Sequence, residues 1–192
     1  MKQHLLISLL VFLVSTNVHT QPKPKYMVDA IAFYQVTETQ KTPVWCWAAS
    51  IAMTLGAQGI KWKQVDVVLA TKGQISIAGA NELEMSAFLN SWNRFDHQGR
   101  TWSVESDYFV GAPPNEAIKR SLEAGRPMII TYRTRPGSQH AVVMYAANFP
   151  DDGDRLHSVY FFDPYTEKKG AATGAEFREN TTNGWDVRVW RR

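Results

Sequence analysis

Residues 42–56 constrain the fold more than any other segment, because they form a long, largely apolar run that contains the only cysteine of the chain. Thr42 can cap a helix, Pro43 suits the first helical position, and Gly56 can end the helix. The segment therefore predicts one helix with Cys46 in its first turns. A thiolate is favoured there, since the unpaired N–H groups and the dipole of a helix N-terminus stabilise an anion.

The rest of the chain predicts helices first and strands later. Helices are expected within residues 62–92, with a Gly-rich break at 77–80 and a second helix over 82–90, and again at 115–124. Short β-rich runs follow at 128–132, 141–147, 158–162 and 185–190. This order predicts an α+β fold in which a helical half packs on a twisted antiparallel sheet, with a cleft between the two.

The N-terminus has the pattern of a bacterial signal peptide. Lys2 precedes an apolar run over residues 5–14, and a polar stretch follows. The run is shorter than the roughly 20 residues that a membrane-spanning helix needs. We expect a signal peptide over 1–20, an exposed linker over 21–27 and one domain over 28–192. The mature protein is then expected to be secreted or periplasmic, without a membrane anchor.

Composition excludes several classes of function. The 192 residues are 44% hydrophobic and 20% charged, which is typical of a globular protein, and the formal net charge is only +3. Lys and Arg are scattered, so no nucleic-acid partner is expected. No metal or cofactor motif is present, and we interpret residues 151–154 as a solvated hairpin loop rather than a calcium site.

The lone cysteine has two interpretations. An exported chain with one cysteine forms no internal disulfide, so Cys46 is either a buried structural residue or a reactive thiol. Gln40, six positions earlier, could direct its side-chain amide at a substrate carbonyl oxygen, as an oxyanion-hole donor does. Gln40 could instead be a solvated loop residue, and Gln35 is a second candidate with a less suitable spacing. Trp45, Trp47 and Met53 are expected to be core residues.

A histidine and an aspartate at strand ends could complete a catalytic set. His140 follows a turn and opens the apolar run of residues 141–147, where a strand end can hold an imidazole at a cleft. Asp163 ends the next run and is followed by Pro164. Adjacent antiparallel strands would bring Asp163 beside His140, where a carboxylate fixes the tautomer and stabilises the imidazolium. A hydrogen-bonded strand histidine and a turn aspartate are the alternatives.

Residues 40–50, with Gln40 six positions before Cys46 and Trp47 directly after it, resemble the active-site segment of papain-like cysteine peptidases. The string of residues 45–50 looks most like the compact bacterial branch of staphopain-like enzymes and plant-pathogen effector proteases, and more loosely like bacteriocin-leader peptidases. The resemblance implies Cys46 as nucleophile, His140 as base, Asp163 as its orienting group and Gln40 in the oxyanion hole. Asp163 stands where plant and lysosomal relatives usually carry asparagine.

Three functions are compatible with these residues. The first is a secreted cysteine endopeptidase that acts on protein or peptide substrates through an acyl-enzyme. The second is an amidase or a transglutaminase-type acyl transfer by the same Cys-His-Asp set. The third is a non-catalytic binding module that keeps the papain-like scaffold. Residues 21–30 are too short for an inhibitory prosegment, so we expect a peptidase competent on folding, with a separate inhibitor protein among its possible partners.

Overall fold

The computed structural model describes residues 24–91, 94–95, 99–135, 138–150 and 153–191. The predicted signal peptide and His97 lie outside these ranges. The helices are α1 (Ala30–Tyr34), α2 (Cys46–Ala57), α3 (Gln64–Lys72), α4 (Glu82–Phe88), α5 (Asn115–Glu123) and α6 (Gly174–Asn180). The strands are β1 (Tyr26–Met27), β2 (Arg94–Phe95), β3 (Thr101–Val110), β4 (Met128–Arg135), β5 (Ser138–Asn148), β6 (Ser158–Asp163), β7 (Lys168–Thr173) and β8 (Thr181–Arg191).

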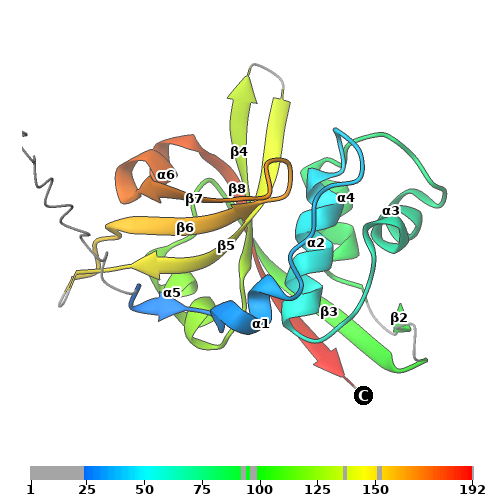
Figure 1. The fold of residues 1–192 in the computed structure, drawn as a ribbon, viewed down its shortest axis with the longest axis horizontal. Helices are drawn as coiled ribbons and strands as arrows, with labels where there is room; N and C mark the ends of the chain where they lie inside the picture. The colour runs from blue at the N-terminus through cyan, green and yellow to red at the C-terminus, as the bar shows by residue number, and fades with distance from the viewer. Residues whose placement is uncertain (1–23, 92–93, 96–98, 136–137, 151–152, 192) are drawn as a thin grey trace, which may run out of the picture.

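The strands of the described residues form one antiparallel sheet in the order β2-β3-β8-β4-β5-β6-β7, with β1 added on β5. Helices α2, α3 and α4 lie together on one side of the molecule, and β5, β6, β7 and α6 lie on the other (Figure 1). This arrangement confirms the predicted α+β fold, a helical half packed on a twisted antiparallel sheet. Within the described ranges, none of the helices has the length and hydropathy to cross a membrane.

Helix α2 is the centre of the core, because it is buried on nearly every side. Residues 47–55 are all buried. One set of its side chains, including Trp47 and Ile51, packs against α3, α4, β3 and β8, and another set, including Met53, packs against β5 and α5. A helix that is apolar all round belongs inside a protein. Trp45, Trp47 and Met53 are buried, as predicted.

The helix begins later than the sequence predicts. The carbonyl of Thr42 accepts the Gln40 side chain at 2.7 Å and the backbone N–H of Trp45 at 3.2 Å. Residues 42–45 therefore form a turn, and α2 begins at Cys46. The Thr42 hydroxyl caps nothing and is buried without a hydrogen-bond partner among the described residues. The consequence is that Cys46 is the first residue of the helix, in the first turns where the sequence analysis expected it.

Other sequence-based expectations differ from the structure at the ends of elements. Tyr26–Met27, placed in the predicted linker, forms β1 and pairs with Ala146 and Ala147 of β5. Strands β3 and β7 and helix α6 were not predicted. The long strand β3 lies within the half expected to be helical, where it pairs with β8 along its length. Its buried residues Trp102 and Val104 pack under α2, α3 and α4.

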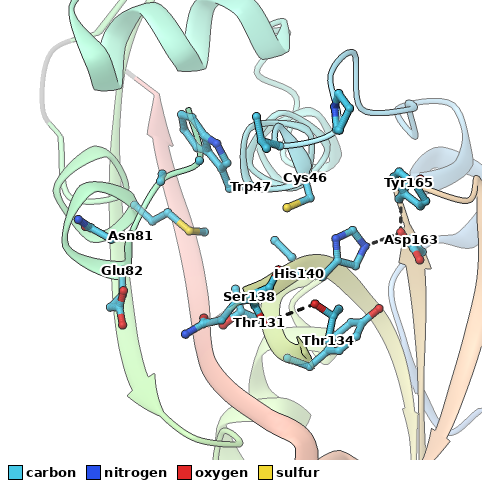
Figure 2. A pocket seen from close by; sticks show the side chains of 18 of the residues that line it. Cys46, Trp47, Asn81, Glu82, Thr131, Thr134, Ser138, His140, Asp163 and Tyr165 are labelled. Carbon is cyan, nitrogen blue, oxygen red and sulfur yellow. Dashed lines mark hydrogen bonds and ion pairs between the residues drawn. The ribbon is translucent and has the colours of Figure 1, made fainter. Parts of the chain in front are cut away.

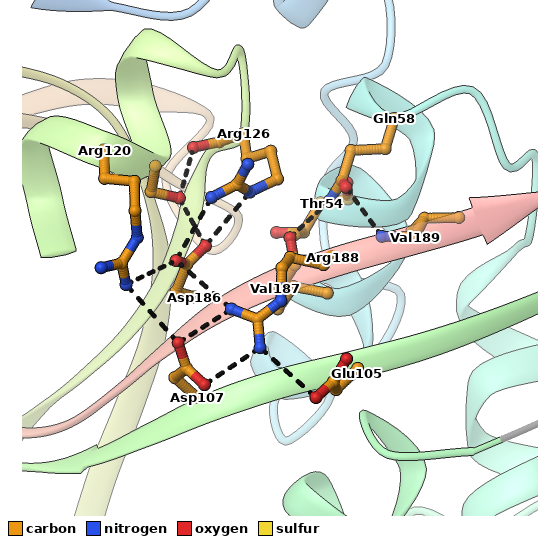
Figure 3. A network of polar contacts seen from close by, with 11 residues as sticks. Thr54, Gln58, Glu105, Asp107, Arg120, Arg126, Asp186, Val187, Arg188 and Val189 are labelled. Carbon is orange, nitrogen blue, oxygen red and sulfur yellow. Dashed lines mark hydrogen bonds and ion pairs between the residues drawn. The ribbon is translucent and has the colours of Figure 1, made fainter.

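A buried aspartate ties α5 to the sheet (Figure 3). Asp186 of β8 is fully buried and accepts hydrogen bonds from the Ser121 hydroxyl at 2.7 Å and from Arg126 at 3.3 Å. Arg188 lies 3.7 Å from the same carboxylate and pairs with Asp107 of β3 at 2.8 Å. The network therefore links α5, β3 and β8.

We predict that Asp186→Ala lowers the free energy of unfolding by about 3 kcal/mol, because Arg126 and Ser121 lose the carboxylate that accepts their hydrogen bonds. Urea denaturation of the parent and of this variant measures the change. Glu123→Ala, at an exposed position at the end of α5, is the control and should change stability by less than about 0.5 kcal/mol. A loss below about 1 kcal/mol for Asp186→Ala would show that the network contributes little.

Candidate active site

Three elements bring Cys46, His140 and Asp163 to the wall of one cleft of about 870 Å³. Cys46 is the first residue of α2, His140 lies near the start of β5, and Asp163 is the last residue of β6. In Figure 2 the Cys46 side chain lies near the imidazole of His140, and a dashed line joins the ring to Asp163. The structure therefore places side by side the three residues that the sequence assigned to one catalytic set.

The carboxylate of Asp163 positions the imidazole of His140, and a backbone N–H in turn positions that carboxylate. His140 Nε2 and Asp163 Oδ1 are 2.7 Å apart, and the backbone N–H of Tyr165 donates to the same oxygen at 2.8 Å. The rings of Tyr132 and Tyr165 meet the imidazole edge to face, with centroids 5.5 Å and 6.4 Å away. Because Nε2 is engaged by Asp163, the nitrogen left for the Cys46 thiol is Nδ1.

The groups around His140 and Asp163 change the pKa values of both side chains. Burial acts to lower the pKa of His140, but hydrogen bonds and charges from Asp163 and Cys46 outweigh burial and raise this pKa to about 9. Burial acts to raise the pKa of Asp163, yet the hydrogen bonds from His140 and from the Tyr165 N–H bring it below its ordinary value. At neutral pH the site therefore holds an imidazolium beside a carboxylate, and an imidazolium is the partner that stabilises a thiolate.

The N-terminus of α2 leaves backbone donors unused at the cleft. Trp45, the N-cap residue, makes no capping hydrogen bond with its side chain. The N–H of Cys46 has no backbone acceptor among the described residues, as expected at a first helical position. Such N–H groups and the helix dipole favour an anion, either a thiolate or the oxyanion of a carbonyl under attack.

Gln40 lies close to this site but does not line the cleft. Its side chain is buried, and Nε2 donates to the Thr42 carbonyl at 2.7 Å, which leaves the second Nε2 proton uncommitted. Its backbone N–H donates to the carbonyl of Pro164 at 2.9 Å, so the loop before α2 is joined to the loop after Asp163. Gln35, the second candidate, is exposed at the end of α1 and lies outside the cleft lining.

A buried glutamine that the sequence analysis did not identify holds the Gln40 loop. Gln64, at the start of α3, is fully buried. Its amide nitrogen donates to the Thr39 carbonyl at 2.6 Å, and its amide oxygen accepts the Lys41 N–H at 3.0 Å. The two bonds bracket Gln40 from both sides. A buried amide that hydrogen-bonds two backbone groups fixes the loop against α3. The position of Gln64 beside this loop depends on the fold and has no local signal in the sequence.

Thr131 and Gln139 of the cleft lining belong to a network of polar side chains from four strands, also not predicted. The Tyr108 hydroxyl donates to Asn183 Oδ1 at 2.6 Å, and Asn183 Nδ2 donates to Thr131 Oγ1 at 3.2 Å and to Gln139 Oε1 at 3.3 Å. Thr182 adds a bond to Gln139 Oε1 at 3.1 Å. Because Gln139 Oε1 already accepts these two hydrogen bonds, the amide N–H groups of Gln139 remain as donors on the cleft that it lines.

Comparison with known families identifies the chain. Residues 28–189 match the Peptidase_C39 like family, and this match extends over most of the sequence. The chain belongs to the Peptidase_C39 like family. Membership of this family supports the assignment of the chain as a cysteine peptidase, which the sequence analysis expected. A search among curated proteins finds no match.

Solved structures share the fold of this Peptidase_C39 like chain. One is the peptidase domain of Streptococcus ComA, a bi-functional ABC transporter involved in a quorum-sensing pathway; the TM-score is 0.55 at 14% identity, over 81% of this chain and 97% of that one. Another is UfSP from C. elegans, with a TM-score of 0.56 at 11% identity, over 92% of this chain but only 36% of that one. These likenesses confirm the papain-like fold. They do not test whether the chain belongs to the branch of staphopain-like enzymes and plant-pathogen effector proteases, so this assignment stays a prediction.

We predict that His140 titrates near pH 9 in the folded protein and that Asp163→Asn lowers its pKa, because the carboxylate that stabilises the imidazolium is lost. NMR titration of the histidine ring protons measures both values. Since the folded pKa lies above the ordinary 6.5, the stabilising contribution of His140 is complete below about pH 6.5 and is lost as the pH rises through about 9. His157, exposed at the start of β6, is the internal reference. An unchanged His140 titration in Asp163→Asn would contradict this account.

Proposed function

We propose that the protein is a secreted cysteine endopeptidase that hydrolyses peptide bonds through an acyl-enzyme on Cys46. The observation that carries the proposal is the 2.7 Å contact between His140 Nε2 and Asp163, which leaves Nδ1 for the thiol at the uncapped start of α2. Membership of the Peptidase_C39 like family supports the same chemistry. A purely structural cysteine would need neither a paired imidazolium nor a cleft.

The first chemical step is attack by the Cys46 thiolate on the carbonyl carbon of the scissile bond. The imidazolium of His140 stabilises the thiolate beforehand. As the carbonyl oxygen gains negative charge, the N–H of Cys46 is the nearest uncommitted backbone donor at the helix start. The spare Nε2 proton of Gln40 supplies a second donor when the side chain turns towards the cleft.

The second step is departure of the amine. His140 Nδ1 gives its proton to the leaving nitrogen, and a thioester is left on Cys46. The neutral imidazole then takes a proton from water, which attacks the thioester and releases the acid product. Asp163 holds the ring through both steps and stabilises the imidazolium each time it forms. The thiolate, the imidazolium and the carboxylate are then restored to their starting states.

Location and partners belong to the same proposal. The N-terminal pattern of residues 1–20 supports export to the periplasm or medium, where proteins or peptides are the substrates. Restraint of the peptidase by a separate inhibitor protein is part of the same proposal.

We predict that Cys46→Ala and His140→Ala each abolish hydrolysis of a casein or proteome-derived substrate while the fold is retained, because each removes a group that reacts. Mass spectrometry of new termini, together with circular dichroism, provides the measurement. His157→Ala is the matched control and should keep parent activity. Hydrolysis by Cys46→Ala would refute the proposal, and products joined to an amine rather than to water would assign acyl transfer instead.

We predict that Gln40→Ala lowers the turnover number on the order of 100-fold with little change in KM, since an oxyanion donor acts mainly in the transition state. Steady-state kinetics of the purified variant measures both constants, and a thermal melt verifies the fold. Gln35→Ala is the control and should behave as the parent does. An unchanged turnover number for Gln40→Ala would assign the oxyanion role to backbone N–H groups alone.

A further inference from the structure

The cleft contains one carboxylate that the proposed reaction does not use. Glu82, the first residue of α4, lines the cleft on the wall opposite His140 and Asp163 (Figure 2). It is half-buried and takes part in no hydrogen bond or ion pair of the described residues. A partly buried carboxylate without a partner carries a desolvation cost that a bound cation offsets.

The position of Glu82 on α4 turns its side chain towards the cleft. Met85, three residues later on the same face of the helix, is buried and also lines the cleft. Ser86, one turn after Glu82, bonds the indole N–H of Trp185 at 2.9 Å, so this face of α4 packs against β8. By contrast, Glu84 pairs with Lys72 at 2.5 Å and caps its own helix. The two acidic residues therefore have different roles.

Among the described residues that line the cleft, the His140 imidazolium on the opposite wall is the cationic group, and Glu82 has none beside it. None of the described residues that line the cleft is Lys or Arg, although the whole chain has a net charge of +3. Tyr108 lies close enough for the Glu82 charge to act on it: burial, and then this charge, raise the pKa of the Tyr108 hydroxyl. That hydroxyl donates its proton to Asn183, so it does not serve as a donor to Glu82.

The walls between Cys46 and Glu82 are apolar. Gly79 and Ala80 form the accessible lining there, and the nearly or fully buried Trp47, Met85 and Trp185 lie behind it. An apolar wall that ends in a carboxylate matches a side chain with a hydrocarbon stem and a cationic end, which is the structure of lysine and arginine. An acidic side chain would be repelled by Glu82, and a short polar one would not reach it.

We propose that Glu82 is a specificity-determining residue, and that the cleft binds a Lys or Arg side chain of the peptide substrate with its stem along the wall and its cation at Glu82. The inference deepens the proposed peptidase function and rests on it. It predicts that peptides with a basic residue at one position near the scissile bond are favoured over peptides with a neutral residue of equal length at that position.

The experiment measures covalent capture of Cys46, so it does not depend on hydrolysis. The full-length mature protein is treated with epoxysuccinyl peptides, extended on either side of the reactive ring, that carry lysine, norleucine or glutamate at each position in turn. We expect the parent to react at least 10-fold faster with lysine than with norleucine at one position. Glu82→Gln should reduce the ratio to about 1, and Glu82→Lys should favour glutamate. Glu123→Gln, remote from the cleft, should retain the parent preference.

Two outcomes would refute the basic-residue subsite at Glu82, and a third would refute the proposed peptidase function. Equal rates for lysine and norleucine at every position in the parent, or the same lysine preference in Glu82→Gln, would refute the role of Glu82. Iodoacetamide, which carries no side chain, should label Cys46 equally in the parent and in both Glu82 variants, so a general loss of reactivity is detected separately. A lysine preference of the parent without hydrolysis of any peptide would leave the subsite in place and refute the peptidase.

Discussion

Burial of α2 is the constraint on which the rest of the structure depends. Residues 47–55 are enclosed by α3, α4, β3 and β8 on one side and by β5 and α5 on the other, so the helix has one position in the fold. Fixing the helix also fixes its first residue. Cys46 is held at the end that meets the cleft, with uncapped N–H groups around it, because the rest of the helix is packed away from solvent.

Electrostatics then divides the cleft into two sides. One side holds the imidazolium of His140, which Asp163 stabilises and which packs against the rings of Tyr132 and Tyr165. The other side holds Glu82, a carboxylate without a partner in the described residues. A network of polar side chains that joins Tyr108 and Asn183 includes Gln139 of the cleft lining. The proposed reaction and the proposed recognition of substrate thus use separate charges, each on its own element.

The residues of the candidate site could be predicted where local sequence carries the signal. Cys46 stands at the start of an apolar helix, and His140 and Asp163 stand at the ends of apolar strands that are adjacent in the sheet, so each position follows from its own segment. The start of α2 could not be predicted, because the competition for the Thr42 carbonyl comes from the Gln40 side chain. Gln64 and Asn183 act through partners more than twenty residues away, for which a single sequence gives no local signal.

The central claim is that Cys46 is the nucleophile of a site that His140 and Asp163 activate, and trapping the acyl-enzyme tests it most directly. The mature protein is mixed with a 4-nitrophenyl ester of an acylated lysine, quenched in acid within the first turnover and digested for mass spectrometry. The account predicts one acyl group per molecule on the peptide that contains Cys46, formed far more slowly in His140→Ala. Ester hydrolysis with the acyl group on another residue, or equal acylation of Cys46 in the parent and in His140→Ala, would contradict it.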